Sequence, residues 1–336
     1  MFKKSIIWSS VVLYVVAAGF LWAADVNVII KEWDAISPNA HPHDSEVAPD
    51  GALWYTGQGA NVLGRLDPKT GQIKEFPLKT PGSGPHGLIA DKEGNIWYTG
   101  NAKAHIGKLN PKTGEVTEYP MPDPAARDPH TPIFDPKGIL WFTVQLGNFV
   151  GKVDPATGKV TLKQSPTPNS APYGMRLDSK GNPWYSEFRT NKVARINPDT
   201  MEITEFTLPQ GARPRRLAIA PDDRVYYSDY ARGYLGRLDP KTGKTEEWPS
   251  PGGPRSMPYA ILAMPDGTIW YSESNIQPNT LVRFDPKDNS FMKWPIPSGG
   301  GVLRHFVATK DGSKIYIACS GVNKVGIVEI TKAASN

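Results

Sequence analysis

The hydrophobic positions of the chain fall into short runs of strand length, separated by turns. In residues 84–120, apolar runs lie at 87–90, 95–99 and 104–110, and an alternating polar and apolar run follows at 115–119. Lys-Glu-Gly-Asn between the first two runs is typical of a hairpin turn. Alternation with a period of two indicates an outer, half-exposed strand. The pattern therefore predicts a unit of four antiparallel strands.

This unit recurs along the chain. Each copy begins with a Pro-His-Gly-type step and ends its second strand with Trp-Tyr-Thr or a close variant. From His43 onward, the equivalent residues are spaced by 43, 44, 43, 42, 44 and about 45 residues. That period is typical of one four-stranded propeller blade. We predict an all-β fold, a seven-bladed β-propeller forming a single domain over residues 25–336.

The two ends of the repeat region complement each other. Residues 28–33 resemble the outer strand of a blade, whereas residues 324–328 follow the third-strand pattern and have no outer strand after them. The N-terminal strand should therefore complete the last blade. Such closure would join the chain ends and protect the edges of the ring.

The N-terminus has the composition of a targeting segment. Lys3 and Lys4 precede an apolar run at 6–24 that ends in Ala23 and Ala24, which predicts an export signal in residues 1–24. An uncleaved membrane anchor is the alternative, because the run is close to the roughly 20 residues that span a bilayer. We expect export to a bacterial periplasm, with membrane contact only through this segment.

Charge and cysteine content exclude some functions. The formal net charge is +5, and it falls to +3 without the two lysines of residues 1–24. This small excess does not indicate a nucleic-acid partner. The single cysteine, Cys319, cannot form an internal disulfide. The 33 Pro and 32 Gly recur at the turns of each repeat, so they indicate turns and not disorder.

Positions that differ between blades are the candidates for ligand binding, because packing explains residues that all blades share. The residue after the proline should lie near the channel mouth, where the chain enters the innermost strand. These ring residues are His43, His86, His130, Tyr173, Arg215, Tyr259 and, in the seventh blade, Arg304 or His305. We predict that they bind a small or peptide-like polar ligand. The alternative for each histidine is a structural role, with the imidazole capping a backbone carbonyl.

A second set of variable positions follows the second strand of each blade. It comprises Gly57, Gly100, Val144, Glu187, Asp229, Glu273 and Cys319. The carboxylates Glu187, Asp229 and Glu273 lie on adjacent blades, so they are candidate ligands for Mg²⁺ or Ca²⁺ if waters complete the coordination sphere. Ion-paired or solvated rim residues are the alternative. A site made of histidines alone is disfavoured, because neighbouring blades separate their side chains too widely for one ion.

Two charged residues lie within the innermost strands. Glu46 and Arg176 share a register at which other blades carry apolar residues such as Ile89 and Leu262. Charges in a narrow channel need partners or water. We therefore expect these two residues to line a water-filled channel.

The repeated phrase Pro-His-Gly, Gly-Asn-Ile-Trp-Tyr-Thr, Ile-Gly-Lys-Leu and Glu-Tyr-Pro resembles that of the virginiamycin B lyase (streptogramin B lyase) family over roughly residues 28–330. The resemblance implies opening of a cyclic depsipeptide by elimination, with Mg²⁺ polarising a carbonyl and a histidine removing the adjacent proton. The family pattern has Glu-Pro-His in the last blade, a second glutamate after its second strand, and a histidine in the preceding blade. The matching residues here are Leu303, Arg304 and His305, then Cys319 or Ser320, and Tyr259.

The resemblance makes His305 the candidate base, but both metal-binding carboxylates are missing. Arg304 or Arg215 would have to stabilise the developing negative charge instead. Streptogramin cleavage is therefore not expected, and a lyase acting on another substrate stays open. Two alternatives from other classes are a non-catalytic periplasmic binding, sensing or protein-interaction module, and a lactonase-like metal-dependent hydrolase.

Overall fold

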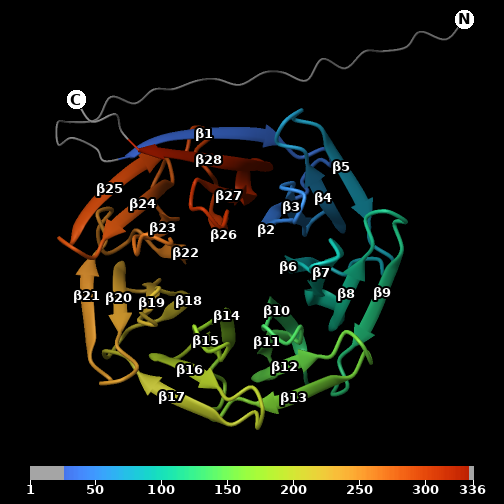
Figure 1. The fold of residues 1–336 in the computed structure, drawn as a ribbon, viewed down its shortest axis with the longest axis horizontal. Coiled ribbons are helices and arrows are strands. Elements are labelled where there is room, and N and C mark those ends of the chain that lie inside the picture. The colour runs from blue at the N-terminus through green and yellow to red at the C-terminus, as the bar shows by residue number, and fades with distance from the viewer. Residues whose placement is uncertain (1–25, 333–336) are drawn as a thin grey trace, which may run out of the picture.

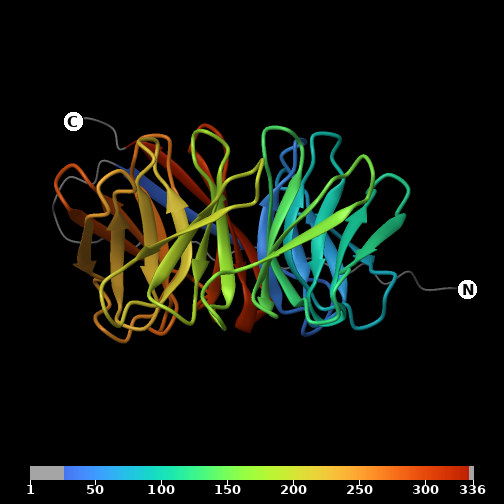
Figure 2. The same ribbon diagram turned by 90° about the horizontal axis from the view of Figure 1, so that it is seen from below.

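Seven four-stranded antiparallel sheets surround a central channel in the computed structural model, which describes residues 26–332 (Figure 1). In blades 1 to 6 the strands follow one another in chain order, from the channel to the periphery (Figure 1). Seen from the side, the ring is a flat disc with loops on both faces (Figure 2). The predicted seven-bladed propeller is confirmed.

Blades 1, 2 and 4 have strands of equal lengths, whereas the first two strands of blade 3 are longer. Blade 1 contains β2 (Pro42–Val47), β3 (Leu53–Gly57), β4 (Val62–Leu66) and β5 (Ile73–Pro77). Blade 2 contains β6 (Pro85–Ala90), β7 (Ile96–Gly100), β8 (His105–Leu109) and β9 (Val116–Pro120), with the 3₁₀ turn η1 (Asn101–Lys103) before β8. Blade 3 contains β10 (Arg127–Phe134), β11 (Leu140–Leu146), β12 (Phe149–Val153) and β13 (Val160–Gln164). Blade 4 contains β14 (Pro172–Leu177), β15 (Pro183–Glu187), β16 (Lys192–Ile196) and β17 (Ile203–Thr207).

The remaining blades complete the ring. Blade 5 contains β18 (Pro214–Ile219), β19 (Val225–Asp229), β20 (Tyr234–Leu238) and β21 (Thr245–Pro249). Blade 6 contains β22 (Pro258–Ala263), β23 (Ile269–Glu273), β24 (Thr280–Asp285) and β25 (Ser290–Pro295). Blade 7 contains β26 (Leu303–Ala308), β27 (Lys314–Cys319), the 3₁₀ turn η2 (Ser320–Val322), β28 (Lys324–Lys332) and β1 (Val26–Asp34).

The N-terminal strand closes the ring as predicted. β1 pairs antiparallel with β28 from Val26 opposite Lys332 to Asp34 opposite Lys324. The last blade therefore joins the two ends of the described chain. The predicted export signal in residues 1–24 lies outside the described residues, and within 26–332 no helix is long and apolar enough to cross a membrane.

The repeated aromatic residues hold the blades together. The second-strand tryptophans Trp54, Trp97, Trp141, Trp184 and Trp270 are at most 1% exposed. Trp97 of blade 2 packs in a cluster with Leu140 and Phe142 of blade 3. In the next strand, a Cβ at Gly64 would overlap the ring of Tyr55, which explains the repeated Ile-Gly-Lys type of motif. These residues recur because every interface between blades needs them, and they report packing and not function.

The last residue of the Trp-Tyr-Thr motif fixes the backbone of the next blade at the channel. Thr56 Oγ1 donates a hydrogen bond of 2.8 Å to the carbonyl of His86, and Thr99 Oγ1 donates one of 2.9 Å to that of His130. The same contact joins Thr143 to Tyr173, Ser186 to Arg215 and Ser228 to Tyr259. A motif that belongs to the core of one blade thus places a ring residue of its neighbour.

Candidate functional site

The ring residues lie together at the mouth of the channel where the innermost strands begin, which we call the entry mouth. Successive ring centroids from His43 to His86, His130 and Tyr173 are 3.7, 3.8 and 3.8 Å apart. Their exposed fractions are only 4%, 5%, 1% and 3%. The predicted convergence is present, but these four rings pack against one another at interplanar angles of 44–47° and offer almost no exposed surface to a ligand.

The strand register decides which residue takes the seventh ring position. Leu303 pairs with Cys319 as Pro258 pairs with Glu273 in blade 6, so Leu303 takes the place of the proline. Arg304 is therefore the ring residue of blade 7, and His305 lies one residue further into β26. In the family pattern the histidine comes directly after the proline. By this register the residue at that place is Arg304 and not His305.

Arg215 is the centre of an aromatic cluster at the entry mouth. Its guanidinium carbon lies 3.8 Å from the ring centroid of Tyr259 and 4.3 Å from that of Tyr230. Its Nε and Nη2 donate to the hydroxyl oxygen of Tyr173 at 3.3 and 3.2 Å, and the Tyr173 and Tyr259 hydroxyls hydrogen-bond to each other. The cation is thus held against aromatic faces, an arrangement that stabilises a desolvated guanidinium.

Positive charge predominates at this mouth. Arg215 and Arg304 are partly exposed, and neither forms an ion pair with a carboxylate in the part of the chain that the structure describes. Arg304 Nε donates instead to Ser320 Oγ at 3.1 Å. Burial raises the pKa of Tyr259, but the charges of Arg215, Arg216 and Arg304 outweigh it and leave that pKa below its ordinary value. The site therefore favours negative charge.

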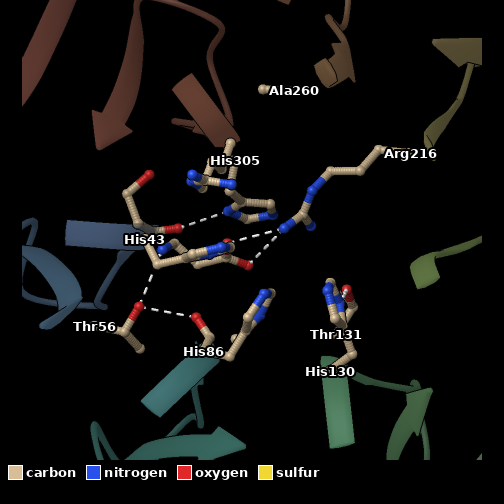
Figure 3. A network of polar contacts seen from close by, with 12 residues as sticks. His43, Thr56, His86, His130, Thr131, Arg216, Ala260 and His305 are labelled. Carbon is tan, nitrogen blue, oxygen red and sulfur yellow. Dashed lines mark hydrogen bonds and ion pairs between the residues drawn. The ribbon is translucent and has the colours of Figure 1, made fainter. Parts of the chain in front are cut away.

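A second layer of polar residues lies directly below the ring residues, and the sequence analysis missed two of its members, Asp44 and Arg216. Arg216 Nη2 donates to Asp44 Oδ1 at 2.9 Å and to Oδ2 at 3.1 Å, and the Nδ1 atom of His43 lies 2.9 Å from Asp44 Oδ1 (Figure 3). Arg216 is 1% exposed, and its Nε and Nη1 are buried without a hydrogen-bond partner among the residues that the structure describes. The signal was available, since the equivalent residues of other blades are the small or neutral Gly87, Thr131, Gly174 and Ala260.

His305 belongs to this second layer. Its Nδ1 is 3.0 Å from the carbonyl oxygen of Ser45 (Figure 3). Its Nε2 is 3.1 Å from Arg176 Nη2. Burial lowers its pKa to about 3, and the charges of Arg216 and Arg176 add to the decrease. Both ring nitrogens are therefore engaged, with Nε2 accepting from the arginine. The assignment of His305 as a base stays a prediction.

The three ring histidines are also neutral. Burial lowers the pKa of His43 to about 4, even though Asp44 opposes the decrease. Burial likewise holds the pKa values of His86 and His130 well below their ordinary value. Uncharged imidazoles can pack closely without mutual repulsion. This is consistent with the short distances between the ring centroids.

The three carboxylates that the sequence analysis grouped as metal ligands do not meet in the channel. Glu187 accepts from Ser165 Oγ at 3.1 Å, and Glu273 accepts from Ser250 Oγ at 2.5 Å. Each serine lies in the segment that enters the blade of its glutamate, so each glutamate holds that segment in place. Asp229 accepts from Arg232 Nε at 2.5 Å within its own blade.

The residues at the family's metal position do not fit a divalent cation. No carboxylate precedes Arg304, because residues 302 and 303 are Val and Leu. Arg304 adds a positive charge beside them, and the thiol of Cys319 donates to Glu32 Oε1 at 3.5 Å. Within residues 26–332, the group with metal-ligand spacing is His43, Asp44 and His86. Because Arg216 contacts both carboxylate oxygens of Asp44, its charge opposes a cation at this place as well.

The chain is similar to known proteins both in sequence and in structure. The model of the virginiamycin B lyase family matches residues 15–247. A streptogramin B lyase structure matches with a TM-score of 0.82 and 29% identity, over 91% of this chain and 98% of that chain. Virginiamycin B lyase from Staphylococcus aureus matches with a TM-score of 0.82 and 26% identity, over 90% of this chain and 99% of that chain.

More distant matches show the fold alone. Hydrazine synthase from Kuenenia stuttgartiensis matches with a TM-score of 0.71 and 13% identity, over 88% of this chain and 97% of that chain. A search of curated protein sequences gives no match. Since the family model covers more than half of the sequence and the lyase structures superimpose over nearly all of their length, the chain belongs to the virginiamycin B lyase family.

Proposed function

We propose that this protein is an exported, periplasmic binding protein that recognises the carboxylate of a small or peptide-like ligand at the entry mouth. The observation that carries the proposal is the pair of ring arginines that have no carboxylate partner among residues 26–332. Arg215 and Arg304 are both partly exposed and flank the buried ring of Tyr259 from blades 5 and 7. Guanidinium groups bind carboxylates through paired, charge-assisted hydrogen bonds.

Aromatic side chains beside Arg215 suit the body of such a ligand. Phe188 and Tyr230 are partly exposed, and their ring centroids lie 4.9 and 4.3 Å from the guanidinium carbon of Arg215. Binding sites combine apolar surface of this kind with a few polar groups that fix orientation. An aromatic or peptide-like acid therefore fits this mouth better than a small inorganic anion.

The same geometry argues against the reaction of the lyases. At the positions of their Mg²⁺ ligands this chain has no carboxylate, since it carries Val302, Leu303 and Cys319 there and the positive charge of Arg304 beside them. The buried imidazoles also have strongly lowered pKa values. A base with a pKa of 3 to 4 removes protons weakly at neutral pH. We therefore favour ligand binding over catalysis as the function of this site.

The experiment compares N-acetylphenylalanine with its uncharged amide by isothermal titration calorimetry. We expect the acid to bind at least 10-fold more tightly than the amide, and R215Q and R304Q each to weaken acid binding at least 10-fold. R195Q is the matched control. Arg195 is a partly exposed arginine of β16, away from the channel, and its guanidinium carbon lies 5.7 Å from a ring centroid of Trp184. Equal affinities for acid and amide, or unchanged binding by both ring variants, contradict the proposal.

A second candidate is an elimination in which Tyr259 is the base. It is favoured by the lowered pKa of that phenol and by the hydrogen bond that lets Tyr173 exchange a proton with it. The phenolate would take the proton next to a carbonyl, the electron pair would form a C=C bond, and the bond from the β-carbon to an ester oxygen would break. The carboxylate released would then lie beside Arg215. Because Tyr259 is 0% exposed, this reaction requires the Arg215 side chain to move aside.

Absorbance of the unsaturated product separates the two candidates. If Tyr259 is the base, a cyclic depsipeptide or another ester of a β-hydroxy amino acid should give an ultraviolet band with the protein and none with Y259F. Binding without any such band supports the non-catalytic function.

A further inference from the structure

A cavity of about 580 Å³ lies at the opposite end of the channel, near the hairpins that join the first and second strands. We call this end the hairpin mouth. Residues at the ends of innermost strands line the cavity, such as Leu177 and Ile219, together with hairpin residues such as Pro221 and Pro265. None of the seven ring residues is among its lining residues. The cavity is therefore separate from the site of the proposed function.

Most side-wall residues of the cavity are apolar, and the hairpins add Asp178, Asp223 and Lys310 to its lining. Ile89, Ile133, Leu262 and Val307 come from four different blades and share one register of the innermost strands. The volume lies within the range of about 300 to 1,000 Å³ that is usual for small-molecule sites. The walls and the volume together suit the hydrocarbon part of a small organic ligand.

Glu46 and Arg176 share the register of these apolar residues, and with His305 they form the polar part of the lining, which we call the floor. This floor has unused hydrogen-bonding capacity. Arg176 makes three hydrogen bonds, to the carbonyls of Met175 and Phe306 and to His305 Nε2. A guanidinium has five N–H donors, so two are left. One carboxyl oxygen of Glu46 accepts from the backbone N–H of Val47 at 2.9 Å. The other has no hydrogen bond to any residue that the structure describes, and Glu46 and Arg176 form no ion pair within 4.0 Å.

The charges around the floor favour an anion. Asp44 is already paired with Arg216, and His305 is uncharged. Burial raises the pKa of Glu46 to about 8, so at neutral pH its carboxyl group is protonated and can donate a hydrogen bond. The positive charge of Arg176 is therefore not balanced at the floor.

We propose that this cavity binds a monocarboxylate with an apolar chain, whose carboxylate lies between Arg176 and Glu46 and whose chain contacts the side walls. Arg176 supplies the positive charge and two donors, and Glu46 supplies a further donor. An uncharged alcohol lacks the attraction to Arg176, and an ammonium is repelled by it. The geometry thus assigns the hairpin mouth to amphiphilic carboxylates.

The test uses octanoate as the probe, with octan-1-ol and octylamine as controls, in calorimetric titrations at pH 7. We expect octanoate to bind at least 10-fold more tightly than either control. R176Q should weaken octanoate binding at least 10-fold, whereas R195Q should leave it unchanged. V307W should abolish binding without altering the floor, because Val307 lines the cavity and is partly exposed. Thermal unfolding of each variant shows whether it is folded.

Two further results separate this site from the entry mouth. Octanoate should bind R215Q and R304Q as tightly as the unchanged protein, and N-acetylphenylalanine should not compete with it. Octanoate binding should also weaken above pH 8, where Glu46 ionises among the groups that face it, namely Asp44, Arg176 and His305, and E46Q should remove this decrease. Equal binding of octanoate and octanol, or unchanged octanoate binding by V307W, overturns the proposal.

Discussion

Arg216 on β18 reaches across the channel to Asp44 on β2, with its Nη2 at 2.9 and 3.1 Å from the two carboxylate oxygens. The two residues are 172 positions apart in the chain and belong to blades 5 and 1. Both side chains are buried, at 1% exposure each. Burial raises the pKa of Asp44, but Arg216, His305 and His43 outweigh it and hold that pKa well below its ordinary value. The pair links opposite sides of the ring through its centre.

Removing the negative partner should destabilise the propeller strongly. D44N leaves a buried guanidinium without its counter-ion, and breaking a buried pair in this way costs about 3–5 kcal/mol. Urea denaturation should show this loss in the free energy of unfolding. R216M combined with D44N should recover most of it, because no unpaired charge remains. The R216M single variant is measured as well. If the free energy of unfolding falls in the double variant by the sum of the decreases in D44N and R216M, the pairing is not what stabilises this layer.

The buried histidines should make the protein sensitive to mild acid. The pKa values of His43, His86, His130 and His305 are all lowered in the folded state. The unfolded chain, with histidine pKa values near 6.5, therefore binds more protons than the folded chain below that pH. Their stabilising contribution is complete above pH 6.5 and is lost as the pH falls toward 4.

The measurement is the free energy of unfolding at half-unit steps from pH 7.5 to 5. H86Q should reduce the slope by about 1.4 kcal/mol per pH unit, the value for one proton. This variant is chosen because, within the described part of the chain, His86 Nδ1 has no hydrogen-bond partner that the substitution would remove. Equal stability at pH 7 and pH 5 contradicts the prediction.

Glu187 and Glu273 should contribute to stability and not to metal binding. Each accepts a hydrogen bond from a serine in the segment that enters its blade, and Glu273 also accepts from the backbone N–H of Gly252 at 2.5 Å. E187A and E273A leave such donors buried without partners, which costs about 1–3 kcal/mol each. Thermal unfolding should show the loss, with E93A on an exposed hairpin as the control. A shift of the transition by millimolar Mg²⁺ that both variants abolish would support the metal hypothesis instead.

The architecture was predictable because each blade needs the same interface residues. Trp97 and Thr99 serve packing and the hydrogen bond to the next blade, so they recur at the blade period and reveal it. The positions of the ring residues follow from this period. Arg304 was ambiguous only because the hairpin between Ala308 and Ile315 is one residue longer than that between Ala90 and Ile96.

The chemistry of the channel was less predictable. Asp44 and Arg216 are adjacent to ring residues in sequence, but nothing in the repeat shows that one side chain reaches across the channel to the other. Glu187 and Glu273 share a position, which suggested convergence, yet that position faces the segment entering the blade. Repeats specify the place of a residue on its blade, whereas the direction and reach of a side chain depend on residues of other blades.

Glu46 should destabilise the folded protein increasingly as the pH rises. Its pKa is raised from an ordinary value of 4.5 to about 8, mainly by burial, with Asp44 adding to the increase and Arg176 opposing it. The folded state therefore binds one proton more than the unfolded state between pH 4.5 and 8, so the contribution of Glu46 to stability falls across this interval. Above pH 8 the carboxyl group is ionised in both states, so the contribution of Glu46 no longer changes with pH.

E46Q isolates this effect from the histidines, which are common to both proteins. The free energy of unfolding of E46Q minus that of the unchanged protein should grow by about 1.4 kcal/mol per pH unit from pH 5 to 8 and then level off. His305 stays neutral over this range and Arg176 stays charged, so neither adds a slope of its own. E93Q is the matched control, because Glu93 lies on an exposed hairpin. A difference that is constant from pH 5 to 9 would mean that water in the hairpin-mouth cavity solvates the Glu46 carboxylate fully, and the floor would then have no protonated donor for a carboxylate ligand.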